Sequence, residues 1–228
     1  MTTNDVMSEL ASLGTEQNRA IYRKHGAKEP IFGVSYANLG TLAKRIKVDQ
    51  QLAESLWATG NHDARILALQ VADTAEITTR IADTWAADCD NYVLADALAG
   101  LVARSPVGPA CAAAWRDRPD EWGASAGWAT TTRLVSAGVL DNAACVALVD
   151  QIVREGHTRP NRVRHEMVMT LIAIGARGDQ RLKQRVLDAN VAIGKVVVDH
   201  GQTGCKTPAI PAYIAKLEAR QAKRSTAG

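Results

Sequence analysis

The sequence predicts an all-α protein in which helix pairs stack into a solenoid. Alanine and other helix-forming residues are abundant, whereas the 228 residues include only one Phe and four Tyr, so a β-sandwich or barrel would lack its usual residues. The seven prolines fall in expected connections or first helical turns. Related segments also recur at roughly 30–40 residues, which is the period of stacked helix pairs. A compact helical bundle is the alternative architecture.

The first 48 residues are expected to form N-terminal helices. Apolar residues at helical spacing predict a first helix over residues 4–23. A loop, KHGAKEPIFGVS at 24–35, separates it from a second helix over 36–46.

The central part, residues 49–195, is expected to hold the stacked pairs. Short breakers such as TGN at 59–61 separate its helices, and Asp120 fits the N-cap of one of them. The predicted helices span residues 49–58, 62–72, 75–85, 91–104, 108–116, 120–137, 142–154, 160–174 and 179–191.

The second helices of these pairs carry the repeated pattern. Each pair has an apolar face that it cannot bury alone, so neighbouring pairs stack and the second helices line the concave side. The chain closes with an irregular segment over 196–211 and a basic helix over 212–223, which together with the end of the chain make up residues 196–228. Residues 1–228 are therefore expected to form one domain. The recurring segments are ARILALQVAD (64–73), YVLADALAGLVAR (92–104), AGWATTTRLVSAG (126–138) and RVRHEMVMTLIAIGA (162–176).

Charge and composition limit the class of protein. A net charge of +3 and a pI near 8.7 permit a polyanionic partner without requiring one. No apolar run approaches the roughly 20 residues that span a bilayer. The polar N-terminus lacks a signal pattern, so we expect a cytoplasmic monomer with no membrane contact. The four cysteines form no CxxC pair, so neither a disulfide framework nor a zinc ribbon is indicated. No metal and no cofactor are expected.

Arginines recur on or beside the second helices. A curved surface with repeated arginines can follow a phosphate backbone, because each contact releases condensed counterions. The alternative is an ordinary solvated helix face, or for Arg65 an ion pair with a nearby acid. In the segment 199–206, Lys206 and nearby backbone N–H groups suit a phosphate, and the alternative is a loop docked on the last repeat. The candidate DNA-binding residues are Arg65, Arg104, Trp128, Arg133, Arg162, Arg164 and Lys206.

Tyr92 and Asp96 are the candidate catalytic residues. They are four residues apart, so they share one helical face. Such a pair suits cleavage of a glycosidic bond to a cationic leaving group, since the carboxylate stabilises an oxocarbenium ion and places water. Aromatic faces attract the cationic base, and Trp122 and Trp128 would complete an aromatic wall. The alternative places these rings in the core and Asp96 on a paired surface.

Longer motifs between residues 22 and 214 carry a family resemblance. They are YRKHGAKEPIFGVSYANLGTLAKRI (22–46), LWATGNHDARILALQVAD (56–73), WAADCDNYVLAD (85–96), EWGASAGWA (121–129), PNRVRHEMVMTLIAIG (160–175) and IGKVVVDHGQTGCKTPAIPAYI (193–214). These segments resemble the DNA alkylation repair family, the AlkD-type glycosylases with HEAT-like repeats, in a divergent bacterial branch. The combination of FGVS with LWxTGxxxAR is the most specific part of the match.

The resemblance implies a right-handed solenoid of HEAT-like helix pairs with a concave basic groove for duplex DNA, alkylated or distorted. The family's groove carries a Trp and, four residues later, an Asp, and these positions fall on Tyr92 and Asp96. The family's Trp-x-Arg-Arg segment reads WGAS at 122–125, so both arginines are missing. A second groove Trp falls on Met169. Three of the four groove positions therefore depart from the pattern.

Two functions stay open at this point. The first is a DNA-binding protein of alkylation repair that also acts as a glycosylase on cationic alkylated purines, with no metal or organic cofactor. In it, Asp96 would stabilise the oxocarbenium ion and Tyr92 would pack on the sugar or base. The alternative is a HEAT-repeat scaffold that binds DNA, or a protein, without base excision. Release of free base from alkylated duplex DNA separates the two.

Overall fold

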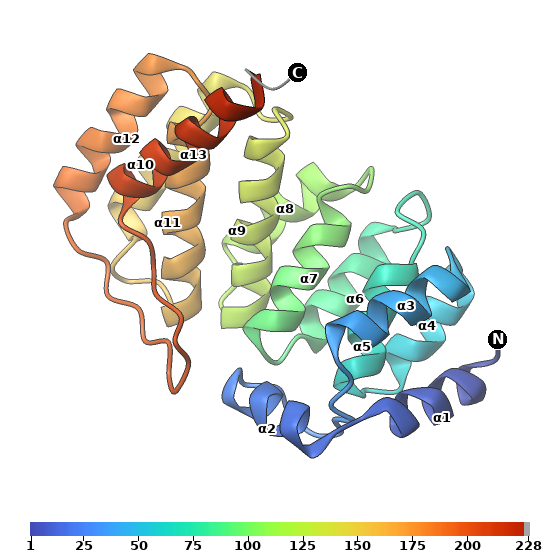
Figure 1. The fold of residues 1–228 in the computed structure, drawn as a ribbon. Helices are drawn as coiled ribbons and strands as arrows, with labels where there is room; N and C mark the ends of the chain where they lie inside the picture. Colours follow the sequence, from blue (N-terminus) through green and yellow to red (C-terminus); the bar gives the residue numbers. More distant parts are fainter. Residues whose placement is uncertain (226–228) are drawn as a thin grey trace.

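The computed structural model describes residues 1–225, and these residues form thirteen helices and no strand (Figure 1). The all-α prediction is confirmed. None of the described helices is long and apolar enough to cross a membrane. The helices are α1 (Thr3–Leu13), α2 (Glu16–Lys24), α3 (Tyr36–Ile46), α4 (Gln50–Ala58), α5 (His62–Val71), α6 (Thr79–Asp88), α7 (Tyr92–Val102), α8 (Gly108–Arg116), α9 (Glu121–Ser136), α10 (Asn142–Glu155), α11 (Asn161–Gly175), α12 (Gln180–Ile193) and α13 (Ile210–Ser225).

Polar side chains at the N-caps fix where most helices begin. Asp49 and Asp120 each accept a backbone N–H from the first turn, at 3.0 and 2.8 Å, because the first four N–H groups of a helix lack partners inside it. Asp120 thus caps α9 as expected. Thr78 caps α6 in the same way at 3.2 Å, so this helix runs Thr79–Asp88 rather than over the predicted 75–85.

The predicted helix over 4–23 is two helices, α1 and α2, which separate at Gly14. The loop before α3 lies so close that a Cβ on Gly14 would stand 2.1 Å from the carbonyl oxygen of Phe32. Thr15 caps α2 with its side chain and donates its backbone N–H to the Gly33 carbonyl at 3.0 Å. Apolar periodicity misses this break because the contact that causes it comes from a later loop.

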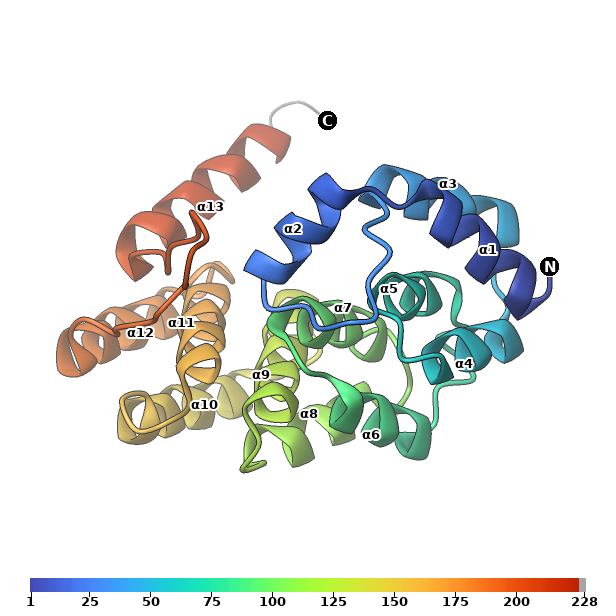
Figure 2. The same cartoon turned by 90° about the horizontal axis from the view of Figure 1, so that it is seen from below.

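Successive helix pairs stack as predicted. The pairs α4/α5, α6/α7, α8/α9 and α10/α11 follow one another, and the second helices α5, α7, α9 and α11 contact their neighbours in a row. Figure 2 shows this row inside an arc, with α4, α6, α8 and α10 along its outer side. The helices α2 and α13 lie on the other side of the row, away from the outer helices.

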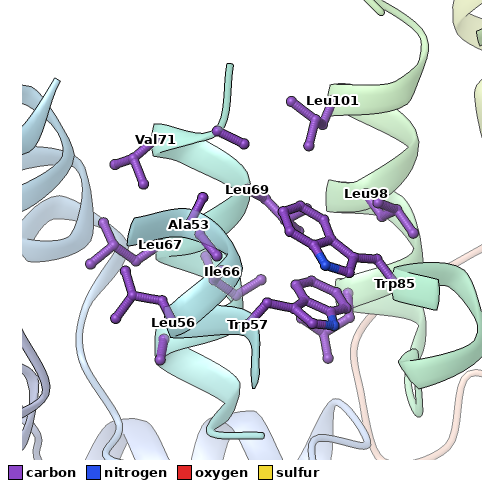
Figure 3. Close-up of a cluster of buried hydrophobic side chains, with 14 of the residues drawn as sticks. Ala53, Leu56, Trp57, Ile66, Leu67, Leu69, Val71, Trp85, Leu98 and Leu101 are labelled. Carbon is purple, nitrogen blue, oxygen red and sulfur yellow. The ribbon is translucent and has the colours of Figure 1, made fainter. Parts of the chain in front are cut away.

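Two clusters of buried apolar side chains run through the stack, the first from α1 to α9 and the second from α9 to α13. In the first, Trp57 of α4 and Trp85 of α6 stack with ring centroids 4.6 Å apart and 12° between planes (Figure 3). The Trp57 indole N–H donates to Asp88 at 2.8 Å, and the Arg65 guanidinium lies 5.1 Å from the Trp57 ring centroid. These four residues are called the tryptophan cluster below.

The C-terminal part follows the prediction in kind. An irregular segment over 194–209, called the strap below, connects α12 to α13. The final helix begins at Ile210 rather than at residue 212 and packs on α11 and α12. The last three residues of the expected domain, 226–228, lie outside the described part of the chain.

Candidate nucleic-acid interface

The predicted pair Tyr92 and Asp96 lies on α7, in the middle of the inner row. Asn91 caps this helix, accepting the N–H groups of the second and third helical residues at 2.9 and 3.1 Å, so Tyr92 is its first residue. Tyr92 is partly buried and Asp96, one turn later, is exposed. Both contact side chains from the neighbouring inner helices, as described next. The side of α7, α9 and α11 that carries these residues is called the groove side.

Asp96 is paired with an arginine from the next inner helix. Arg133 of α9 places Nη2 at 2.8 Å from Asp96 Oδ1 and at 3.1 Å from its backbone carbonyl. Nη1 of the same guanidinium donates to the Ala129 carbonyl at 2.9 Å. The Asp96 side chain is 51% exposed and that of Arg133 is 35% exposed. The carboxylate proposed for catalysis is therefore already ion-paired, although it faces solvent.

Tyr92 is covered by an arginine from α11. The Arg162 guanidinium lies 4.3 Å from the Tyr92 ring centroid, and its Nη2 pairs with Glu166 at 3.1 Å. The backbone N–H of Arg162 donates to Glu121 of α9 at 2.6 Å. The face of this ring is therefore already occupied by a cation of the protein, Arg162. The groove cluster, as used below, comprises Tyr92, Asp96, Arg133, Arg162 and Glu166.

Glu166 is the buried acid of the groove cluster. Its residue exposure is 5%, and burial raises the pKa of its carboxyl to about 7, opposed mainly by the Arg162 charge. The negative charge of Asp96 acts in the same direction as burial. Close to neutral pH, Glu166 is thus only partly ionised, and the cluster carries two guanidinium groups against the one exposed carboxylate of Asp96.

The strap crosses the groove side beside Tyr92. Asp199 is fixed by Asn161 of α11, whose amide donates to its carbonyl at 2.8 Å and accepts its N–H at 2.7 Å. Thr207 Oγ1 lies 3.0 Å from His165 Nδ1 and 3.0 Å from His200 Nε2. A cavity of about 160 Å³ remains between the strap and the end of α2. Lys24, His25, Gly26, Tyr92, Trp122, Asn161, Arg162, Asp199, His200 and Thr203 line it.

Three other predicted DNA-binding residues are in reach of solvent. Arg104, just past α7, is exposed, and its Nη1 lies 3.9 Å from where a Cβ on Gly100 would stand, with Arg133 Nε 3.7 Å from the same point. Arg164 is partly buried and donates to Asn161 at 3.3 Å. Lys206 is exposed on the strap. Whether these side chains meet DNA stays a prediction.

Two predicted DNA contacts are placed elsewhere. Arg65 donates to the carbonyl of Asp88 at 3.0 Å and lies 3.7 Å from its carboxylate, so it connects α5 to the outer helices, which is the intramolecular alternative. Trp128 is 0% exposed and packs in the second core cluster, so the expected aromatic wall does not include it. Because α9 packs against α7, α8 and α11, a large ring on its buried side lies in the core, and the Arg116 guanidinium of α8 lies 5.7 Å from the Trp128 ring centroid. Met169 is partly buried against the same cluster.

A second cavity, which the sequence interpretation missed, lies beside the groove cluster. It measures about 400 Å³ and is bordered by Tyr22 of α2, Tyr36 of α3, His62 of α5 and Val93 of α7. The rings of Tyr22 and Tyr36 meet edge to face with centroids 6.1 Å apart. His25 borders both cavities and contacts the Tyr92 hydroxyl through Nδ1. The only sequence signal was the concentration of tyrosine and histidine in residues 22–36, far from the second helices.

In the described part of the chain, no three His, Cys, Asp or Glu side chains are grouped so as to hold a metal ion. Cys89, Cys111 and Cys145 are buried, and Cys205 is exposed on the strap.

Comparison with known proteins identifies relatives over nearly the whole chain. A family model described as DNA alkylation repair enzyme matches residues 6–197. Uncharacterized proteins of Listeria innocua and Listeria monocytogenes are 25% and 26% identical over 226 residues, covering 96% of this chain and 99% of each relative. A solved structure is similar with a TM-score of 0.84 and 27% identity, covering 98% of this chain and 95% of its own. It is described as a new family related to the HEAT-like repeat DNA glycosylases with affinity for branched DNA structures.

Proposed function

The chain belongs to the DNA alkylation repair enzyme family and has the HEAT-like repeat fold, and from this premise we propose that it binds DNA along the groove side. We place its preference with branched or distorted DNA and its main role in binding rather than in base excision. The similar solved structure, whose family has affinity for branched DNA, supports this choice of ligand.

The observation that carries the proposal is the position of two arginines. A glycosylase for cationic alkylpurines needs an open aromatic face and a free carboxylate at the point where positive charge arrives. Here Arg162 covers the Tyr92 ring and Arg133 pairs with Asp96. A cationic base would meet two guanidinium groups, and like charges repel. A phosphate would instead meet complementary charge.

The surroundings of the groove cluster add further cations. Lys24 borders the 160 Å³ cavity beside Tyr92 together with Arg162 of the cluster, neutral donors such as Asn161, and one acid, Asp199. Arg104, two residues past the end of α7, and Lys206, on the strap, are both exposed. Neither forms an ion pair with another described residue. Several cations facing one surface favour a nucleic-acid backbone, since binding it releases counterions.

Base excision is the second candidate function, and one observation favours it. Asp96 remains 51% exposed and one helical turn from an aromatic ring, the arrangement that stabilises an oxocarbenium ion in the related enzymes. If Arg133 moves onto a phosphate when DNA binds, the carboxylate is released for that role.

One experiment with Asp96→Asn separates the two functions. Affinity is measured for a four-way junction and a linear duplex of the same length, and free base is measured from duplex DNA carrying 7-methylguanine or 3-methyladenine. We expect tighter binding to the junction, no base release, and increased affinity in the variant, because it removes a negative charge and frees Arg133. Base release by the wild type that disappears in Asp96→Asn would instead establish a glycosylase. A chain that binds neither DNA would refute the proposal.

A further inference from the structure

We propose that the 400 Å³ cavity between α2, α3 and α5 receives one unpaired nucleobase of the DNA bound on the groove side. This inference rests on the proposed function and names the part of branched DNA that the protein recognises. The cavity has an aromatic wall and the size of a single small ligand, and it lies next to the cations proposed to bind the backbone.

The cavity offers ring faces and apolar surface to an occupant. Tyr36 is 52% exposed and Ile21 is 42% exposed, which is unusual for side chains of this size. Tyr22 lies between Tyr36 and His62, with its ring centroid 6.1 Å from the first and 5.4 Å from the second. The volume lies in the range of small-molecule sites, and sequence-independent base recognition relies on stacking against such rings.

The cavity wall is held in place before any ligand binds. The buried carboxylate of Asp63 accepts three backbone N–H groups from the loop before α3, at 2.7, 3.1 and 2.7 Å. The Tyr22 hydroxyl donates to the Val34 carbonyl in the same loop, and the His62 N–H donates to the Pro30 carbonyl at 3.0 Å. A preformed wall reduces the entropy lost on binding, so stacking energy appears as affinity.

The lining excludes an anion and suits a neutral ring. Neither Lys nor Arg nor an acid borders the cavity, whose residues are Asn18, Ile21, Tyr22, His25, Ser35, Tyr36, His62 and Val93. Burial lowers the pKa of His62, so its imidazole is neutral near pH 7. Asn18 also lines the cavity, and its amide supplies a donor and an acceptor that can pair with the edge of a base, whereas an aliphatic ligand would leave them unpaired.

The position of the cavity links it to the groove cluster. His25 borders both this cavity and the smaller one that contains Lys24 and Arg162, and Val93 follows Tyr92 on α7. A backbone phosphate held by Lys24 and Arg162 would therefore have its base at the mouth of the aromatic cavity. Unpaired nucleotides at a branch point leave the helical stack at little cost, whereas paired ones do not, so the cavity selects branched DNA.

The test compares two forked duplexes that differ at one unpaired nucleotide at the branch. One carries 2-aminopurine there and the other carries an abasic analogue. Affinity is measured by fluorescence anisotropy and base stacking by 2-aminopurine emission. We expect the fork with the base to bind about tenfold more tightly, with quenched emission, as one stacked base provides. Tyr36→Ala removes both differences without weakening binding to the abasic fork, and Tyr36→Phe retains them.

The outcomes distinguish this inference from the proposed function. Equal affinity for the two forks, or a preference unchanged by Tyr36→Ala, overturns the base-binding cavity and leaves DNA binding in place. If the protein binds neither of the forks nor the four-way junction, both the base-binding cavity and the proposed function are overturned. Quenching and preference that Tyr36→Phe keeps and Tyr36→Ala loses support the assignment, since Tyr36 is exposed at the start of α3 and its loss leaves the core intact.

Discussion

The tryptophan cluster and the groove cluster use the same three kinds of side chain. In the first, Arg65 lies 5.1 Å from the Trp57 ring centroid and 3.7 Å from the Asp88 carboxylate. In the second, Arg162 lies 4.3 Å from the Tyr92 ring centroid and 3.1 Å from the Glu166 carboxylate. The two arginine side chains are almost equally exposed, at 16% and 15%. Arginine exposure therefore does not separate a structural cluster from a candidate binding cluster.

The acids separate them. Asp88 is 41% exposed, so it is a solvated partner that balances Arg65. Glu166 is buried and its pKa is raised to about 7, so it balances Arg162 only in part near neutral pH. Arg133 adds a second cation on the groove side. Burial of one carboxyl group thus gives the groove cluster a positive excess that the tryptophan cluster lacks, and the predictions below test this difference.

The largest expected effect concerns the tryptophan cluster. Trp57 is 2% exposed, so Trp57→Ala leaves a cavity in the core. It also removes the stacking on Trp85 and the hydrogen bond to Asp88. We expect the free energy of unfolding to fall by about 3–5 kcal/mol, measured by urea denaturation. Tyr92→Ala is the control from the groove cluster. Its free energy of unfolding should fall by only about 1 kcal/mol, because Tyr92 is partly exposed. Equal losses would mean that both clusters are structural.

The second effect is a pH dependence of stability that Glu166 gives the groove cluster. Glu166 has a folded pKa of about 7 against an ordinary 4.5, so the folded state binds its proton more tightly than the unfolded state does. This contribution to stability is present below pH 4.5 and is lost as pH rises to 7. Comparing wild type with Glu166→Gln, we expect the difference in unfolding free energy to change by about 3 kcal/mol over that window.

Neighbouring charges require this comparison rather than the wild type alone. Burial lowers the pKa of His165 to about 4 from 6.5, so its contribution is present above pH 6.5 and is lost as pH falls to 4. Between pH 4.5 and 6.5 the two groups oppose each other in the wild type. Arg162, Arg133 and Asp96 also act on Glu166 and are retained in the variant. Parallel stability curves for wild type and Glu166→Gln would contradict the raised pKa.

The sequence predicts those parts of this comparison that depend on one helix. The four-residue spacing places Tyr92 and Asp96 on one face, and the repeated period predicts the row of second helices. Contacts with the next helix cannot be predicted in this way. Arg133 lies 37 residues after Asp96, and their contact depends on how α7 and α9 are aligned. Helical periodicity also does not distinguish the buried ring of Trp128 from the groove-side ring of Tyr92, because both lie on inner helices.

The smallest predicted effect compares two arginines of the inner row. Arg104 is exposed without an ion pair among the described residues, whereas Arg65 is held in the tryptophan cluster. Arg104→Gln should lower DNA affinity and reduce the slope of log affinity against log salt by about 0.9, the value for one lost phosphate contact, with unchanged stability. Arg65→Gln should keep the slope and lose about 1–2 kcal/mol of stability, because its bonds to the Asp88 carbonyl and carboxylate disappear.

Affinity titrations at four salt concentrations measure the slopes of the two variants. A reduced slope in Arg65→Gln would place this arginine of α5 in contact with the DNA, and an unchanged slope in Arg104→Gln would remove this end of α7 from the interface. The matched pair therefore tests whether charge excess, rather than the mere presence of arginine, marks the surface that meets DNA.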